Sequence, residues 1–156
     1  MSYVVSGLPL EPFRPFFGLS DEALAEHGAI RYRVDANPGF PCRVTLEDAQ
    51  PGETVLLLNY EHLDVDSPYR SRHAIFVSEA ATQSRRLVDE IPGALAVRKA
   101  ISLRAFDDAG MMLDAEIASG ADLEPIIARM FADPATAYLH AHNAGRGCYA
   151  ARIDRA

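Results

Sequence analysis

Hydrophobic and polar residues alternate along much of the chain, and this period of two is typical of β-strands with one buried face. The clearest example is residues 101–106, where Ile, Leu and Ala alternate with Ser, Arg and Phe. Segments of turn-forming residues separate such runs, so the pattern predicts a series of hairpins. We expect strands at 29–35, 42–49, 54–62, 73–79, 96–107, 111–119, 136–143 and 148–154.

Three turns predict which of these strands are neighbours. The Pro-Gly pair within 36–41 predicts that 29–35 and 42–49 form an antiparallel pair. The Asp-Ala-Gly connection at 108–110 and the Ala-Gly-Arg-Gly turn at 144–147 each predict a hairpin between the strands on either side.

Helix signals are fewer. Ser20 is a candidate N-cap for a short helix over Asp21–His27. Residues 121–133 carry apolar side chains at helical spacing, and another short helix is expected within 80–93. The apolar positions of 121–133 are Leu123, Ile126, Ile127 and Met130.

Seven to nine strands with two or three short helices, in no strict alternation, predict an α+β fold with a mostly antiparallel sheet of several hairpins. A chain of 156 residues is most simply a single domain spanning 1–156. Prolines at 9, 12 and 15 interrupt the first segment. We therefore expect 1–19 to be an irregular N-terminal arm packed on the body through its aromatic rings.

The composition disfavours several classes of protein. Hydrophobic residues at 49% and charged residues at 24% are ordinary for a globular chain rather than a disordered one. The net charge of −7 disfavours binding to nucleic acids and to anionic membranes. The first residues lack the basic start of a signal peptide, and apolar runs such as Val55–Leu58 are too short to cross a bilayer. We expect a cytoplasmic protein.

Cys42 and Cys148 are too few for a disulfide scaffold or a four-thiolate zinc site. In a reducing compartment both thiols are expected to be free. Cys148 is also a candidate nucleophile, because Arg146 and the nearby histidines could favour its thiolate. The more ordinary interpretation of such a residue is a small buried hydrophobe.

Two histidines separated by one residue are the most distinctive feature of the C-terminal region. If 138–142 is extended, Tyr138, His140 and His142 share one face of the strand. Imidazoles at this spacing can bind one metal ion, but catalytic zinc takes three protein ligands. A third ligand would have to come from His73, a cysteine or a carboxylate, so we favour an ordinary polar strand face over a metal site.

A second cluster of polar residues lies between 67 and 73. Arg70, Ser71 and Arg72 could bind a carboxylate or a phosphate, since guanidinium groups contact such anions in a bidentate manner. The adjoining His73 could transfer protons near neutral pH. The alternative is that both arginines pair with the acidic residues of 63–66 or with loop carbonyls. The cluster lacks the glycines of a nucleotide-binding loop.

The segments LLLNYEH, SPYRSRHAIFV, SLRAFDDAGMM and YLHAHNAGRGCYAARIDR resemble a family of uncharacterised bacterial proteins, domain of unknown function 1203. The resemblance implies a small soluble bacterial protein with an α+β fold. It assigns no catalytic residue, although the similar segments include Arg70, His73, His140, His142 and Cys148.

Three hypotheses follow, and the sequence does not decide whether the chain is an enzyme. The first is a binding or assembly domain that forms a homodimer by covering exposed strand edges. The second is a site for a small anionic ligand, in which Arg70 holds the anion and His73, His140, His142 or Cys148 perform chemistry. The third is a metal site on His140 and His142. We rank them in this order and expect no cofactor.

Overall fold

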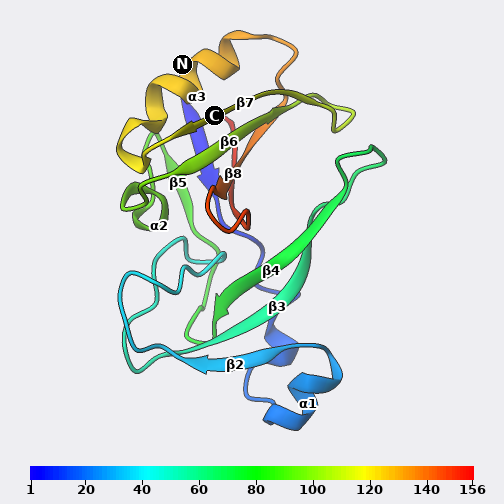
Figure 1. Ribbon diagram of the computed structural model, residues 1–156, viewed down its shortest axis with the longest axis vertical. Coiled ribbons are helices and arrows are strands. Elements are labelled where there is room, and N and C mark those ends of the chain that lie inside the picture. The colour runs from blue at the N-terminus through cyan, green and yellow to red at the C-terminus, as the bar shows by residue number, and fades with distance from the viewer.

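The computed structural model describes residues 1–156 and contains two antiparallel β-sheets (Figure 1). The larger sheet has six strands in the order β5-β1-β9-β8-β6-β7, and the smaller sheet has three strands in the order β2-β3-β4. The strands of the larger sheet are β1 (Tyr3–Ser6), β5 (Arg86–Val88), β6 (Ile101–Phe106), β7 (Met112–Ala118), β8 (Tyr138–Asn143) and β9 (Tyr149–Arg155). Those of the smaller sheet are β2 (Ile30–Arg33), β3 (Thr54–Leu63) and β4 (Ser71–Ser78).

Helices are few and short. They are α1 (Asp21–Glu26), α2 (Gly93–Ala96) and α3 (Leu123–Ala132), with 3-10 turns at Arg14–Phe16 and Gly120–Asp122. The hydroxyl of Ser20 accepts a hydrogen bond from the backbone N–H of Ala23, which confirms the predicted N-cap. The α+β fold with mostly antiparallel pairing is thus confirmed. No helix has both the length and the apolar character needed to span a lipid bilayer.

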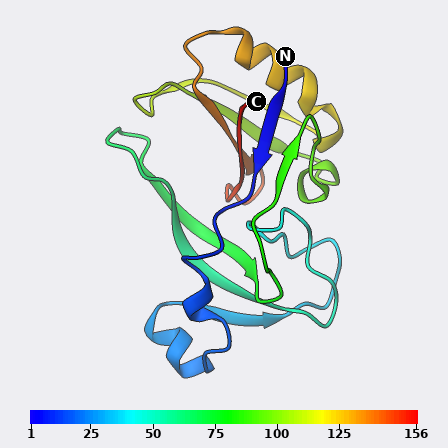
Figure 2. The same cartoon turned by 180° about the vertical axis from the view of Figure 1, so that it is seen from behind.

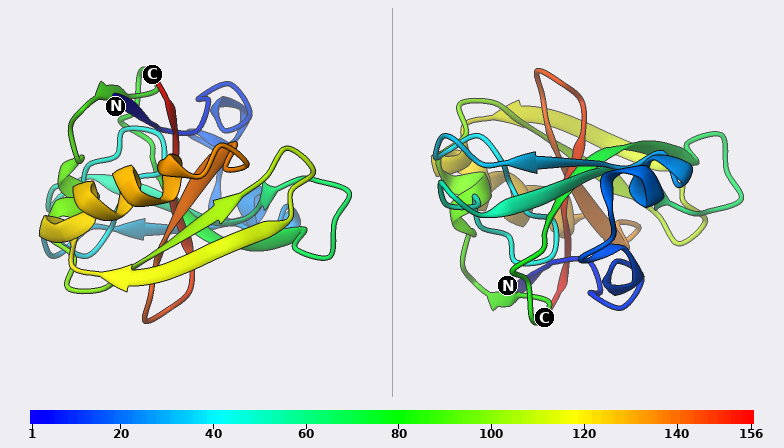
Figure 3. Two further views of the ribbon diagram at one scale, coloured as in Figure 1. Left: turned by 90° about the horizontal axis from the view of Figure 1, so that it is seen from above. Right: turned by 90° about the horizontal axis from the view of Figure 1, so that it is seen from below.

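The six-stranded sheet has two chemically different faces. Its outer face packs against α3, which lies over the sheet when the molecule is seen from above (Figure 3). Leu103, Leu139 and Ile153 point to this side and share a core with Ile127 of α3. The inner face, opposite α3, is turned towards the three-stranded sheet, which lies below it along the long axis (Figures 1 and 2). Alternation along β8 places the predicted histidine face on this inner side.

Residues 42–49 do not form a strand, so the predicted pairing of 29–35 with 42–49 is wrong. β2 pairs instead with β3, with Ile30 opposite Leu57. Cys42, Arg43 and Val44 are buried in succession, which a strand with one buried face does not allow. This segment is a packed loop.

Two further predictions need correction. The helix expected within 80–93 is wrong, because Arg86–Val88 is a strand and the short α2 begins only after Pro92. The arm 1–19 is not irregular throughout, since Tyr3–Ser6 forms β1 between β5 and β9. The interrupting prolines all follow β1, so they leave this strand free to pair.

Candidate functional site

Three histidines from the two sheets meet between them. His62 lies on β3 of the smaller sheet, and His140 and His142 lie on β8 of the larger one. One ring nitrogen of each residue lies within 4.8 Å of the others. His140 and His142 are each only 2% exposed, whereas His62 is partly buried. His62 is separated from His140 and His142 by some eighty positions in sequence, so only the packing of the sheets brings it to them.

Two β-bulges flank this cluster. In the β3–β4 ladder Tyr60 is opposite His73 and Leu63 is opposite Ser71, so β3 has one extra residue where His62 stands. In the β8–β9 ladder Ala141 is opposite Ala151 and His142 is opposite Tyr149, so β9 has an extra residue. A bulge bends its strand and changes the direction of the adjacent side chains. Both irregularities therefore contribute to how the imidazole rings are aimed.

Aromatic rings enclose the cluster. The ring of Tyr149 is stacked on that of His62, with 5.2 Å between centroids and 11° between planes. The same ring contacts His140 edge-on, with 5.0 Å between centroids. Phe106 also meets His140 edge-on, at 5.5 Å. These apolar neighbours exclude water and fix the ring planes.

The hydrogen bonds of the three imidazoles are incomplete. His142 Nδ1 lies 2.9 Å from the carbonyl oxygen of Gly147. Nδ1 of His62 and Nδ1 of His140 are buried without any hydrogen-bond partner. A buried polar atom without a partner is costly, so these two nitrogens point to a missing partner.

Burial lowers the pKa of each histidine, because the charged imidazolium is poorly solvated there. The pKa falls to about 4 for His62, about 2 for His140 and about 3 for His142. The positive charge of Arg104 lowers all three pKa values further. All three rings are therefore neutral at pH 7, which is the form that binds a metal.

The donor set fits a transition metal. Three imidazoles suit zinc, copper, iron and nickel, whereas magnesium and calcium prefer oxygen ligands. Zinc–nitrogen bonds of about 2.0–2.1 Å require nitrogens closer together than the limit of 4.8 Å observed here. Where the nitrogens are farther apart than such bonds allow, metal binding would require the imidazole side chains to rotate.

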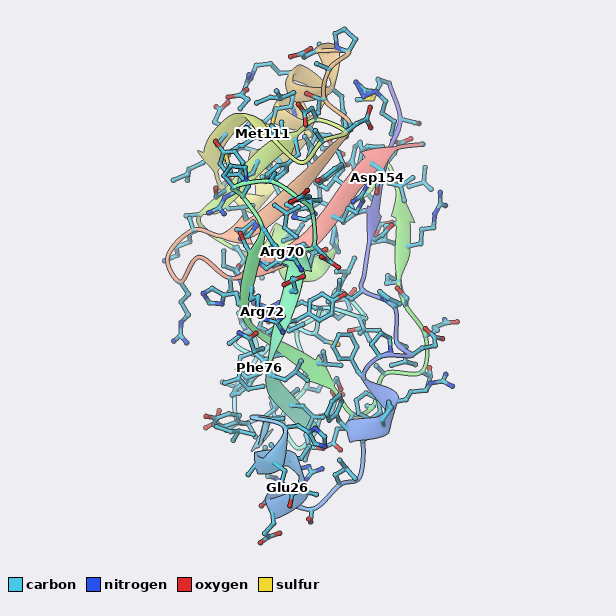
Figure 4. All side chains as sticks on the ribbon, turned by 90° about the vertical axis from the view of Figure 1, so that its right-hand side faces the viewer. Glu26, Arg70, Arg72, Phe76, Met111 and Asp154 are labelled. Atoms are coloured by element: carbon cyan, nitrogen blue, oxygen red, sulfur yellow. The ribbon has the colours of Figure 1, made fainter.

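The arginine cluster lies elsewhere and is paired with acids. Arg70 Nη2 lies 2.9 Å from Glu61 and 3.1 Å from Asp64, and its side chain is 55% exposed. Arg72 donates to Asn59 and Glu61. Figure 4 shows Arg70 and Arg72 near the middle of the long axis, on the side facing the viewer. Of these ion pairs only Arg70–Asp64 involves the acidic residues of 63–66 that the sequence offered as the alternative, since Glu61 lies outside that segment.

The other candidates do not share one place. Ser71 donates to the backbone carbonyl of Tyr69 within its own hairpin. His73, opposite Tyr60 on β4, has its Nδ1 3.1 Å from the carbonyl oxygen of Ala74. It is not one of the three clustered histidines.

The two cysteines are both buried and free. Cys148 Sγ accepts hydrogen bonds from Arg43, at 3.1 Å, and from Asn143, at 3.4 Å. Its charged neighbour is thus Arg43, a residue that the sequence did not single out, rather than the predicted Arg146.

His62 was also missed from sequence. It stands in a run that predicts a buried strand, and no second metal ligand follows it at a recognisable spacing. The one signal in the sequence was that His62, a polar aromatic residue, follows Glu61 at the end of an apolar strand. That signal alone could not identify its partners on β8.

The chain was compared with protein families, curated proteins and solved structures. The family model described as "Protein of unknown function (DUF1203)" matches residues 39–155. The chain belongs to this family. The match spans β3 and β8, and hence all three histidines of the cluster. No curated protein and no solved structure is significantly similar to the chain.

Proposed function

We propose that this DUF1203 chain binds one divalent transition-metal ion, with zinc as the preferred ion, through His62, His140 and His142. The observation that carries the proposal is the convergence of three neutral imidazoles, two of them almost fully buried, within 4.8 Å. The cluster contains no carboxylate or thiolate, so the ligand set is all nitrogen.

Three protein ligands leave one position of a tetrahedral zinc ion for water or a substrate. This pattern is typical of catalytic zinc, which lowers the pKa of its bound water and polarises carbonyl or phosphoryl groups. Arg104 lies on the same inner face, opposite His140 across the β6–β8 ladder. Its only side-chain hydrogen bond goes to Ser102, so it could attract an anionic group towards the metal.

The order of the three hypotheses therefore changes. The metal site rises because β3 supplies a third histidine. The anionic-ligand site at Arg70 falls because Glu61 and Asp64 already neutralise that guanidinium. The assembly hypothesis retains one argument, the exposed edge strand β7, in which Ile117 is 66% exposed.

Metal titration tests the proposal directly. Untagged, metal-depleted protein is titrated with zinc against a chromophoric indicator, and bound metal is counted by elemental analysis. We expect one ion per chain for the wild type and for His27→Ala, a control that removes an exposed histidine outside the cluster. His62→Ala, His140→Ala and His142→Ala are each expected to lose stoichiometric binding.

His62 gives the sharpest variant because it is only partly buried, so its removal disturbs the core least. Cobalt substitution gives a second readout, since a tetrahedral cobalt site absorbs visible light strongly and a hexa-aqua ion does not. Absence of stoichiometric metal in the wild type would overturn the proposal. Zinc binding by folded His62→Ala at wild-type affinity would overturn it as well.

A further inference from the structure

A cavity of about 650 Å³ lies at the opposite end of β8 from Tyr138 and is separate from the histidine cluster. Four parts of the chain surround it: the loop 38–43, Phe76 on β4, the segment 97–100 before β6, and the β8–β9 turn. In Figures 1 and 2 this turn lies between the larger sheet and the long loop that joins β2 to β3. The volume is in the range of sites for small metabolites.

The lining of the cavity is strongly basic. It includes four cationic side chains and no carboxylate, although the chain as a whole has a net charge of −7. Asp48 neutralises one of the four, Arg98, through contacts of 2.7 and 3.0 Å. Arg43, Lys99 and Arg146 have no acidic partner. A cavity with this balance of charge favours anions.

Arg43 is the most unusual of these residues. It is only 3% exposed, and its guanidinium donates to the carbonyl oxygens of Tyr149 and Pro41 and to Cys148 Sγ. These three contacts use three of its five N–H groups, so two have no acceptor within the protein. A buried cation without a counter-charge is costly, and a bound anion would offset that cost.

Two aromatic side chains also line the cavity. Phe40 and Phe76 both line it, with 5.2 Å between their ring centroids and 53° between their planes. Val97 and Ala100 are further apolar lining residues. Aromatic rings in the lining suit the flat, apolar part of a ligand.

From this arrangement we infer that the cavity binds a small organic anion, in which a carboxylate or phosphate contacts Arg43, Lys99 and Arg146 and an aromatic part contacts Phe40 and Phe76. The inference goes beyond the proposed metal site, and none of these residues belongs to the histidine cluster.

Isothermal titration calorimetry with four probes tests the inference on metal-depleted protein, so that metal at the histidines does not contribute. Phenyl phosphate and benzoate carry both the anion and the ring. Benzyl alcohol has the ring without the charge, and inorganic phosphate has the charge without the ring. We expect at least one ring-bearing anion to bind clearly more tightly than either partial probe. Tighter binding of phenyl phosphate would identify a phosphate head group, and tighter binding of benzoate a carboxylate.

The variants separate local contacts from net charge. Lys99→Gln combined with Arg146→Gln is expected to weaken binding about tenfold or more, because two cationic contacts are lost. Both residues are exposed at the rim, so the fold should tolerate the change. Arg85→Gln combined with Arg86→Gln removes the same charge from exposed positions outside the cavity and should leave affinity unchanged.

Lys99 offers an independent readout because it is the only lysine in the chain. A bound anion is expected to slow acylation of its amine, with the N-terminal amine as internal reference. The inference is overturned if neither ring-bearing anion binds. It is also overturned if inorganic phosphate or benzyl alcohol binds as tightly as the ring-bearing anions. Equal loss of affinity in the Lys99/Arg146 and Arg85/Arg86 double variants would overturn it as well.

Discussion

His142 and Gly147 are joined by a hydrogen bond of 2.9 Å between the Nδ1 atom and the carbonyl oxygen, across the turn that links β8 to β9. A carbonyl oxygen can only accept, so Nδ1 carries the proton and the lone pair is on Nε2. Metal-binding histidines are commonly oriented by such a bond from the second nitrogen. The turn thus leaves Nε2 as the nitrogen of His142 that would bind the proposed metal ion.

This relationship predicts that the two roles of His142 can be separated. In His142→Asn the side-chain amide N–H stands near the position of Nδ1 and can still donate to Gly147, but no atom replaces Nε2. Zinc affinity should fall by more than the roughly 10–100-fold that loss of an outer hydrogen bond costs. The metal-free stability in urea should stay within about 1.5 kcal/mol of the wild type.

His142→Ala is the companion variant, because it removes both the ligand and the bond to Gly147. It should lose zinc binding and also unfold at lower urea than His142→Asn. If His142→Asn bound zinc as the wild type does, the imidazole of His142 would not be a ligand.

A second prediction concerns the coupling of the two sheets. A metal on His62, His140 and His142 would connect β3 with β8, which share no backbone ladder. At a free zinc concentration of 100 times Kd the folded state should gain about 2.7 kcal/mol. Hydrogen exchange measured by mass spectrometry should show slower exchange in peptides covering Thr54–Leu63 when zinc is present.

His62→Ala supplies the control for this experiment, since it retains both sheets but removes the ligand from β3. Zinc should leave its exchange in β3 unchanged. Protection confined to β8 and β9 in the wild type would show that the ion does not bridge the sheets.

Only part of the histidine cluster could be predicted from the sequence. The period of two along 138–142 correctly predicted that His140 and His142 share a face, because alternation is a local property of a strand. The position of His62 beside these two histidines could not be predicted, for the opposite reason. Its place depends on how one sheet packs on another and on an extra residue in β3, and neither leaves a pattern in the local sequence.

The same division applies to the fold. The hairpin of β6 and β7 and that of β8 and β9 were predicted, because their turns lie between adjacent strands. The pairing of β1 with β9 was not, since it joins residues at opposite ends of the chain. The prediction for residues 42–49 was wrong because their hydrophobic and polar residues alternate as in a strand. In the structure the segment is a loop in which consecutive residues are buried.

Acid sensitivity should arise in the smaller sheet, where Arg31 of β2 contacts Glu79, the residue that follows β4. Arg31 donates to both carboxylate oxygens of Glu79, at 2.6 and 3.1 Å, and these bonds lower the pKa of Glu79 below its ordinary value of 4.5. A lowered carboxyl pKa stabilises the fold fully above that ordinary value and ceases to do so as the pH falls through the folded-state pKa.

Glu79→Gln should therefore lower the free energy of unfolding by about 1–3 kcal/mol at pH 7. The gap between variant and wild type should narrow below pH 4.5 and nearly close once the wild-type carboxylate is protonated. Urea unfolding from pH 7 to pH 3 measures this. Glu26→Gln, at an exposed position on α1, is the control, and its free energy of unfolding at pH 7 should stay within about 0.5 kcal/mol of the wild type.

Gly7 lies where the chain after β1 passes close to the loop that contains Val44. A Cβ atom built at this position would lie 2.1 Å from the carbonyl oxygen of Val44, which is backbone and cannot rotate away. Gly7→Ala should therefore force the chain after β1 away from the loop that carries Arg43, and should cost about 3 kcal/mol or more in thermal or urea unfolding. Gly145→Ala is the matched control, because a Cβ there would meet no atom within 4 Å. Equal stability of the two variants would mean that this approach is looser than the structure has it, and that Arg43 is less firmly positioned at its cavity.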